Sequence, residues 1–409
     1  RVRQPQADAH ELANAIALIR TAKKPLIIAG GGVLYAQATQ TLRKWVEQCG
    51  IPVCETQAGK SALAWNHTYQ LGAVGVTGSP AANELADEAD LIIAIGTRLQ
   101  DFTTGSHSLF KQAKLLSINV QMLDAMKWHA TTVVGDAQVC IQQLSEELQD
   151  YQSANDWQSK AKAAALAWQN STLAITRALP TGLPYDAHCI GAVQDSAADS
   201  DINDIAVCAA GTLPAELHKL WRTQTPSGYH MEYGYSCMGY EIAGGLGVKM
   251  AKPDREVVVM IGDGSYMMLN AEIATSIMLG LKLIIVVQDN RGYGCINRLQ
   301  VSCGGASFNN LLDNCVHEGG ENIPIDFAAH AASMGAIAQH VASVGALKVA
   351  LIKARQNTRT TVLVIDTTPH ETTQDGGCWW EVAVPEVSER DEVRRARETY
   401  LHNKALQKI

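Results

Sequence analysis

The sequence has no apolar run that could cross a membrane. Its apolar stretches, such as residues 91–95 and 283–287, have the length of single strands, whereas a bilayer requires about 20 consecutive apolar residues. It also has no lysine and arginine cluster that could neutralise a run of phosphates, because 33 basic residues stand against 41 acidic ones, for a formal charge of -8. These absences predict a protein with neither a membrane nor a nucleic-acid partner.

Paired cysteines are also missing. The ten cysteines are scattered, and no two of them form a C-x-x-C pair, so neither a disulfide framework nor a metal-type spacing is indicated. The amino terminus does not resemble a secretion signal, and together with the thiols this predicts a cytoplasmic protein. The chain opens on Arg1 rather than on methionine and reads like a linker entering a domain, so we expect a further segment before it.

The length and the hydrophobic pattern indicate several folded domains. The chain has 409 residues, of which 47% are hydrophobic and 18% charged, and this composition is typical of globular proteins. Short apolar runs alternate with amphipathic stretches, which favours parallel strands with helical crossovers. The expected strands are residues 25–29, 51–54, 91–95, 115–120 and 131–134, then 204–209, 256–261, 283–287 and 361–366.

This pattern predicts an α/β protein with two doubly wound parallel-sheet (Rossmann-like) domains joined by a helical connector. We expect the first domain at residues 1–150, the connector at 151–182, the second domain at 183–370 and a tail with a surface helix at 371–409.

Two expected strands of the second domain end in glycine-rich turns that carry an oxygen ligand. Residues 262–265 read Gly-Asp-Gly-Ser, and residues 289–294 read Asp-Asn-Arg-Gly-Tyr-Gly. Open α/β sheets bind ligands beyond the carboxyl ends of their strands, and oxygen ligands suit a Mg²⁺ ion that also holds phosphate. One such turn alone would favour simple closure of a strand–helix unit. The pair, with Asp263 and Asn290 separated by 27 positions, favours a ligand site.

This spacing resembles the motif of the thiamin diphosphate-dependent enzymes, and the resemblance covers the second domain. It implies that Asp263, Asn290 and the carbonyl group of Gly292 hold Mg²⁺. Met238 stands 25 residues before Asp263 and matches the bulky apolar residue that wedges between the two cofactor rings; without the family it would be core filler. Residues 209–213 resemble the loop that wraps the diphosphate. The implied cofactor-binding residues are Gly211, Thr212, Leu213, Ser236, Met238, Gly262, Asp263, Gly264, Ser265, Asn290, Gly292, Tyr293 and Gly294.

A closer resemblance narrows the chemistry. The segments 55–60, 229–241, 292–297 and 379–388 are similar to the trihydroxycyclohexane-1,2-dione hydrolase family of inositol catabolism. The resemblance implies that a small cyclic diketone is opened between its two carbonyl groups to give 5-deoxy-glucuronate, because the cofactor supplies the electron sink that side chains lack. Two alternatives remain: an acetolactate synthase-like carboligase, which would consume pyruvate, and a non-catalytic cofactor-binding or assembly module.

The family activates its cofactor with a glutamate from an amino-terminal pyrimidine-binding domain, presented across a dimer interface. No counterpart of that glutamate is found in this sequence, so the catalytic residue is unassigned. The resemblance therefore implies a homodimer or homotetramer, and we expect the isolated chain to be an inactive fragment.

Two further groups of residues have a functional and a structural interpretation. Gly30, Gly31 and Gly32 weakly resemble a dinucleotide fingerprint, but a glycine turn that permits close helix packing is favoured. Some relatives bind flavin or a nucleotide in this domain and others do not, so that ligand stays open. His230 and Glu232 either act as acid and base on a polyol ring or are ordinary satisfied polar residues.

The remaining candidates follow the second motif or lie in the tail. Cys295 and Asn297 come just after the metal loop, where substrate or a lid could lie. The favoured interpretation of Trp379 and Trp380 is that they cover a hydrophobic edge. The alternative is that they form a lid over the active site.

Overall fold

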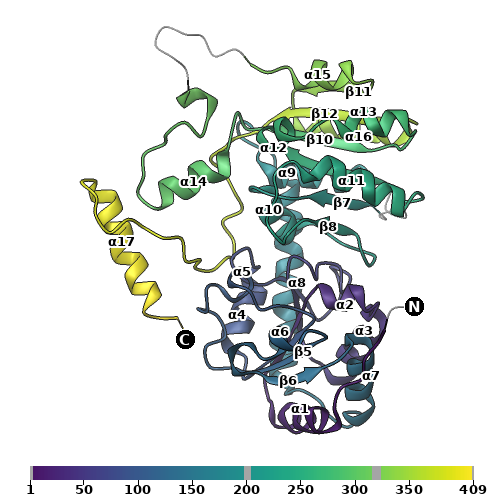
Figure 1. Cartoon of the computed structure of the whole chain (residues 1–409), viewed down its shortest axis with the longest axis vertical. Coiled ribbons are helices and arrows are strands. Elements are labelled where there is room, and N and C mark those ends of the chain that lie inside the picture. The colour runs from purple at the N-terminus through teal and green to yellow at the C-terminus, as the bar shows by residue number, and fades with distance from the viewer. Residues whose placement is uncertain (1–2, 198–203, 316–323, 408–409) are drawn as a thin grey trace.

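The computed structural model describes residues 3–197, 204–315 and 324–407. Arg1, on which the expectation of a preceding segment depends, lies outside them. The chain forms two six-stranded parallel sheets, one in each half, and Figure 1 shows them one above the other. The predicted fold class is confirmed. Among the described residues, no helix has the length and apolar character needed to cross a membrane.

The first sheet has the strand order β3-β2-β1-β4-β5-β6. Its central strands are buried along their whole length because helices cover both faces, which explains their continuous apolar sequence. The strands are β1 (Pro25–Ala29), β2 (Val53–Glu55), β3 (Gln70–Ala73), β4 (Leu91–Ile95), β5 (Lys114–Asn119) and β6 (Thr131–Val134). The helices are α1 (Ala9–Thr21), α2 (Gly31–Tyr35), α3 (Thr39–Cys49), α4 (Pro80–Glu88), α5 (Asp101–Thr104), α6 (Met122–Ala125) and α7 (Ala137–Glu147).

The second sheet has the order β11-β12-β10-β9-β7-β8. Its strands are β7 (Ile205–Cys208), β8 (Tyr229–Met231), β9 (Val257–Gly262), β10 (Ile284–Asp289), β11 (Ile337–Val341) and β12 (Thr361–Asp366). The helices are α9 (Asp186–Asp195), α10 (Leu213–Leu220), α11 (Tyr240–Ala251), α12 (Asp263–Met268), α13 (Glu272–Met278), α14 (Gly294–Ser302), α15 (Phe327–Ser333) and α16 (Val344–Gln356).

The sequence did not predict three strands, and each of them lies at a sheet edge. β3, β8 and β11 pair with a neighbour on one side only. β3 contains a glycine, β8 has three residues, and β11 is largely exposed. An edge strand needs little buried apolar surface, so its sequence lacks the continuous apolar run that marks the central strands.

The connector is a single helix, α8 (Asn155–Arg177), as predicted. Its two tryptophans, Trp157 and Trp168, are buried, and the indole N–H of Trp157 donates to the carbonyl oxygen of Pro25 at 2.9 Å. One hydrophobic cluster runs from Leu26 of β1 through both tryptophans to Met260 of β9. The helix therefore joins the cores of the two halves.

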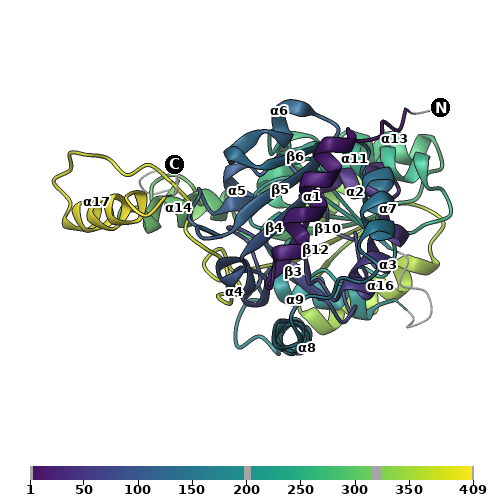
Figure 2. The same ribbon diagram turned by 90° about the horizontal axis from the view of Figure 1, so that it is seen from below.

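The tail crosses from the second sheet back to the first half and ends in α17 (Asp391–Lys404). Figures 1 and 2 both show α17 set to one side of the two sheets, near α14. Val393 and Tyr400 of α17 form a small apolar cluster with Val384, Cys303 and Trp379. The expected surface helix is thus present, with a small core of its own.

Candidate functional site

The carboxyl ends of both sheets border one cavity of about 1810 Å³. The strand order reverses between β1 and β4 in the first sheet and between β7 and β9 in the second. Loops that follow these strands line the cavity, with Gly32 and Gly96 on one side and Gly211 and Gly262 on the other. Open α/β sheets bind ligands at such switch points, so the topology alone marks this cavity as the candidate site.

The structure brings the predicted cofactor residues together. Twelve of the thirteen line the cavity, and the exception is Asp263. This aspartate begins α12 and is only 4% exposed, so its carboxylate lies just beneath the lining. The role of these residues as cofactor ligands stays a prediction.

Two buried oxygens at neighbouring strand ends lack a hydrogen-bond partner. Asp263 follows β9 and Asn290 follows β10, and these strands pair side by side. The Oδ2 atom of Asp263 accepts the N–H of Gly292 at 2.7 Å, but its Oδ1 atom and the Oδ1 atom of Asn290 have no partner among the described residues. Buried polar atoms are almost always satisfied, so this pair of oxygens is suited to a cation.

The environment of Asp263 is unfavourable to a bare carboxylate. Burial, followed by the charge of Asp289, raises the pKa of Asp263 to about 7, although N–H groups of Gly292, Gly264 and Asn290 oppose the shift. A bound cation would reverse this balance because it favours the ionised form. The carbonyl group of Gly292 is the third oxygen that the sequence predicted for this position.

The position of Met238 is fixed by the hydrogen bonds of the next residue, Gly239. The N–H of Gly239 donates to the hydroxyl of Ser265 at 2.8 Å and to the carboxylate of Glu241 at 2.9 Å, and Ser265 donates in turn to Glu241 at 2.7 Å. Burial raises the pKa of Glu241. Ser265, predicted as a cofactor residue, thus also positions the Met238 loop.

Glu232 fixes the other side of the same loop. Its carboxylate accepts the N–H groups of Tyr235 at 3.0 Å and Cys237 at 2.8 Å, and burial opposes but does not outweigh these bonds, so its pKa is lowered. His230 does not line the cavity, and its Nε2 atom lies 2.6 Å from the hydroxyl of Tyr240, which does. His230 therefore fits the interpretation as a satisfied polar residue, whereas Glu232 lines the cavity, so both of its interpretations stay open.

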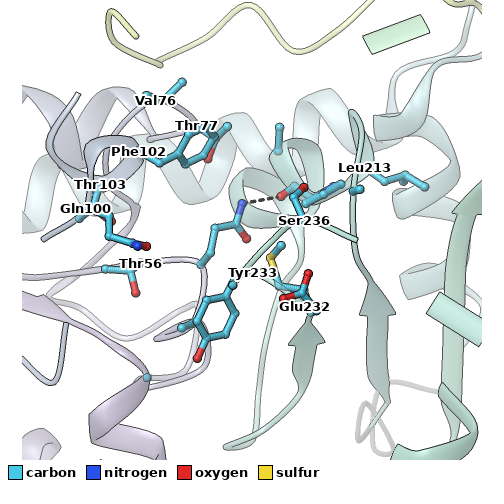
Figure 3. Close-up of a pocket in the computed structure, with 18 of the residues that line it drawn as sticks. Thr56, Val76, Thr77, Gln100, Phe102, Thr103, Leu213, Glu232, Tyr233 and Ser236 are labelled. Carbon is cyan, nitrogen blue, oxygen red and sulfur yellow. Dashed lines mark hydrogen bonds between the residues drawn. The ribbon is translucent and has the colours of Figure 1, made fainter. Parts of the chain in front are cut away.

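The half of the chain that contains the first sheet, called the central domain from here on, supplies the opposite wall of the cavity. Figure 3 shows Thr56, Gln100 and Phe102 on one side, and Leu213 and Ser236 on the other. The two sides are connected by a further lining residue, Gln57. Its amide donates to the carbonyl group of Pro214 at 3.0 Å and accepts the hydroxyl of Tyr229 at 2.9 Å.

A buried ion pair stands behind this wall. Lys60 and Glu55 lie 2.9 Å apart, and both side chains are 3% exposed. Lys60 also donates to the carbonyl group of His218 in α10 at 2.9 Å, and the ring of His218 contacts the hydroxyl of Thr77 and the carbonyl group of Glu55. Burial lowers the pKa of His218 to about 3. The pair therefore holds helix α10, and with it the loop before that helix, against the central domain.

Two buried acidic residues, Asp186 and Glu216, line the cavity near the loop at residues 209–213. Glu216 of α10 accepts both the N–H and the hydroxyl of Thr373. Asp186 begins α9 and lines the cavity, and burial, with the charge of Glu216, raises its pKa to about 7. Neither residue belongs to a recognisable motif, so only the folded arrangement reveals them.

Of the remaining candidates named from the sequence, some line the cavity and others do not. Cys295 lines the cavity, whereas Asn297 is buried away from it. Trp380 also lines the cavity, donating to the carboxylate of Asp101 at 2.9 Å and standing edge-on to Phe102. Trp379 instead packs near Tyr400 of α17.

The glycine run after β1 permits a close approach of two backbones. A Cβ atom on Gly30 would lie 2.4 Å from the carbonyl oxygen of Gly96, and one on Gly32 would lie 2.6 Å from the Cα atom of Gly96. Close packing, the favoured interpretation of this run, is therefore what the structure shows.

Two family models match the chain. The central domain of thiamine pyrophosphate enzymes matches residues 12–144, and the C-terminal TPP binding domain of thiamine pyrophosphate enzymes matches residues 209–365. The first match contains all six strands of the first sheet. The second begins directly after β7 and contains β8 to β11, most of β12 and both glycine-rich turns.

Among curated proteins, the chain is similar to two enzymes named 3D-(3,5/4)-trihydroxycyclohexane-1,2-dione hydrolase. The protein from Bacillus cereus is 41% identical over 419 residues, which cover 96% of this chain and 65% of the relative. The protein from Clostridium perfringens is 39% identical over 427 residues, which cover 97% of this chain and 66% of the relative. The chain thus spans about 65% of the length of the curated relatives that it matches.

Proposed function

Because the chain belongs to the thiamine pyrophosphate enzyme family, we propose that its cavity binds thiamin diphosphate (thiamine pyrophosphate) together with Mg²⁺. The observation that carries this proposal is the pair of buried, unpartnered oxygens on Asp263 and Asn290. With the carbonyl group of Gly292 they form a set of hard oxygen ligands, which is what Mg²⁺ prefers when phosphate oxygens complete its shell.

The protein that carries this chain is, in our proposal, a hydrolase of a carbon–carbon bond. Its substrate is trihydroxycyclohexane-1,2-dione, as the names of the similar proteins suggest. Its product is 5-deoxy-glucuronate, as the resemblance of the four segments implies. Thiamin diphosphate, when bound, supplies the electron sink for the bond that breaks.

The residues of this chain bind and orient the cofactor and enclose the substrate. Met238 supports the cofactor rings, and its position depends on Glu241, Ser265 and Glu232. The loop at Gly211 has room for a close ligand, since a Cβ atom there would meet nothing within 4 Å. Gln57, Thr77 and Gln100 offer hydrogen bonds to the hydroxyl groups of a polyol ring from the facing wall.

We further propose that the protein is cytoplasmic and works as a homodimer or homotetramer. All ten cysteines are free, which suits a reducing compartment. Large apolar side chains are exposed on consecutive helices of the second half, namely Met267 and Met268 on α12 and Met278 on α13. An exposed apolar region of this kind suits a subunit contact.

Turnover of two substrates tests the proposed activity. The protein that carries this chain, supplied with thiamin diphosphate and Mg²⁺, should convert the cyclic diketone to an acid and leave pyruvate unchanged, and an Asp263→Ala variant should convert neither compound. Consumption of pyruvate with an untouched diketone would show a carboligase instead. Binding of the cofactor without turnover of either compound would favour a non-catalytic module.

A further inference from the structure

Arg298 of α14 lies between the loop after β7, which we assign to the diphosphate, and the segment after β12. Its guanidinium donates to the hydroxyl of Thr212, in the loop after β7, and to the carbonyl oxygen of Pro369. A Cβ atom built on Gly294 would lie 3.2 Å from the amide nitrogen of Asn290 and 3.4 Å from Nη1 of Arg298. The same glycine therefore borders both the predicted metal ligand and the guanidinium, which lines the cavity.

The charge of Arg298 is not neutralised at close range. Both of its acceptors are neutral, and in the described part of the chain no carboxylate lies within ion-pair distance of it; Asp186 and Glu216 attract it only from farther away. A guanidinium is always charged and carries five N–H donors. Lys219, another cation of this half that lines the cavity, donates to the carbonyl groups of Thr373 and Asp375.

The charges at the proposed site do not balance without a further cation. A diphosphate carries more negative charge than a single phosphate group, which already has about −1.5 to −2 charges at neutral pH. The two positive charges of Mg²⁺ and the one negative charge of an ionised Asp263 add only a single net positive charge, so negative charge remains. Uncompensated charge in a partly enclosed site is costly, and Arg298 stands beside the loop that would hold the phosphates.

We propose that Arg298 is a diphosphate-binding residue whose guanidinium hydrogen-bonds to the phosphate oxygens. The inference rests on the proposed function and adds a ligand that the Gly-Asp-Gly motif does not contain. An arginine is suited to this task because its planar fork of donors matches phosphate oxygens.

Calorimetric titration of the full chain in Mg²⁺ tests the assignment, with thiamin diphosphate, inorganic diphosphate and thiamin as probes. Arg298→Met should weaken binding of both diphosphates about 10-fold to 100-fold, as expected for lost hydrogen bonds to a charged group, and should leave any binding of thiamin unchanged. Arg298→Lys keeps the charge but not the fork, so its loss should be smaller. The control is Arg390→Met, because Arg390 also donates to a backbone carbonyl but is half exposed and does not line the cavity.

The outcomes separate this assignment from the proposed function. If the wild-type chain binds both diphosphates and Arg298→Met binds them equally well, the assignment is wrong and the proposed function stands. If the wild-type chain binds neither, both are wrong. Thermal melting of each variant identifies a fold defect, and Arg298→Lys supplies the answer if Arg298→Met does not fold: unchanged affinity together with an unchanged salt dependence would then overturn the assignment.

Discussion

Removal of Lys60 should destabilise the protein strongly, because it would leave a carboxylate buried without its cation. Both side chains of the Lys60–Glu55 pair are 3% exposed, and breaking such a buried pair from one side costs about 3–5 kcal/mol. Glu55 would keep the N–H of Ser61 and the amide of Gln70 as donors, at 3.1 and 3.0 Å. These two bonds reduce the penalty, so we expect Lys60→Met to cost about 3 kcal/mol, near the lower limit.

Urea unfolding followed by circular dichroism measures this effect as a shift of the midpoint. The double variant Glu55→Gln/Lys60→Met should regain stability relative to Lys60→Met, because no buried charge remains. Lys127→Met is the matched control: Lys127 pairs with Asp124 at 2.6 Å, with side chains 39% and 18% exposed, so its loss should cost less than about 1 kcal/mol. A loss below about 1 kcal/mol for Lys60→Met, or no recovery in the double variant, would refute the reasoning.

Three further changes test other parts of the account. The pKa of His218 is about 3 in the folded chain, against 6.5 for a free histidine. Only the unfolded chain therefore binds a proton at this ring, and the free energy of unfolding should fall by about 1.4 kcal/mol per pH unit below 6.5. The urea midpoint of His218→Gln should decline less than that of the wild type between pH 7.5 and 5, and an equal decline would contradict the lowered pKa. The pKa of Asp186 shifts in the opposite direction, from 3.8 to about 7, so the folded chain retains a proton that the unfolded chain releases. Asp186→Asn should therefore be more stable than the wild type at pH 8, by up to about 4 kcal/mol, and should show no such gain near pH 4. Gly59→Ala would place a methyl group 1.9 Å from the carbonyl oxygen of Ala29, so its melting temperature should drop by an amount worth about 1–3 kcal/mol, whereas Gly182→Ala, with nothing within 4 Å, should melt like wild type.

The central strands and the two glycine-rich turns could be predicted from the sequence, since both depend on local patterns. A strand such as β4 is buried on both faces and must be apolar throughout. The turns after β9 and β10 carry a characteristic spacing, and pairing of these strands brings Asp263 and Asn290 together. In both cases a short stretch of residues contains the whole signal.

Three of the four edge strands, β3, β8 and β11, and the facing wall of the cavity could not be predicted, because they depend on contacts distant in the sequence. Gln57 meets Pro214, and Lys60 meets the carbonyl group of His218, across more than 150 positions. No periodicity or spacing marks such pairs. Arg298 carries no such local signal either, since its proximity to Thr212 exists only in the folded chain.

The most direct test of the central claim is calorimetric titration of the chain with thiamin diphosphate, in Mg²⁺ and again in EDTA. The wild-type chain should bind in Mg²⁺ and lose that binding in EDTA, and Asp263→Ala should not bind in either. Asp366→Asn is the control, because Asp366 ends the neighbouring strand β12 but is exposed and pairs with His340 at 2.9 Å; it should bind like wild type. Absence of binding by the wild type, or equal affinity in EDTA or after Asp263→Ala, would contradict the account.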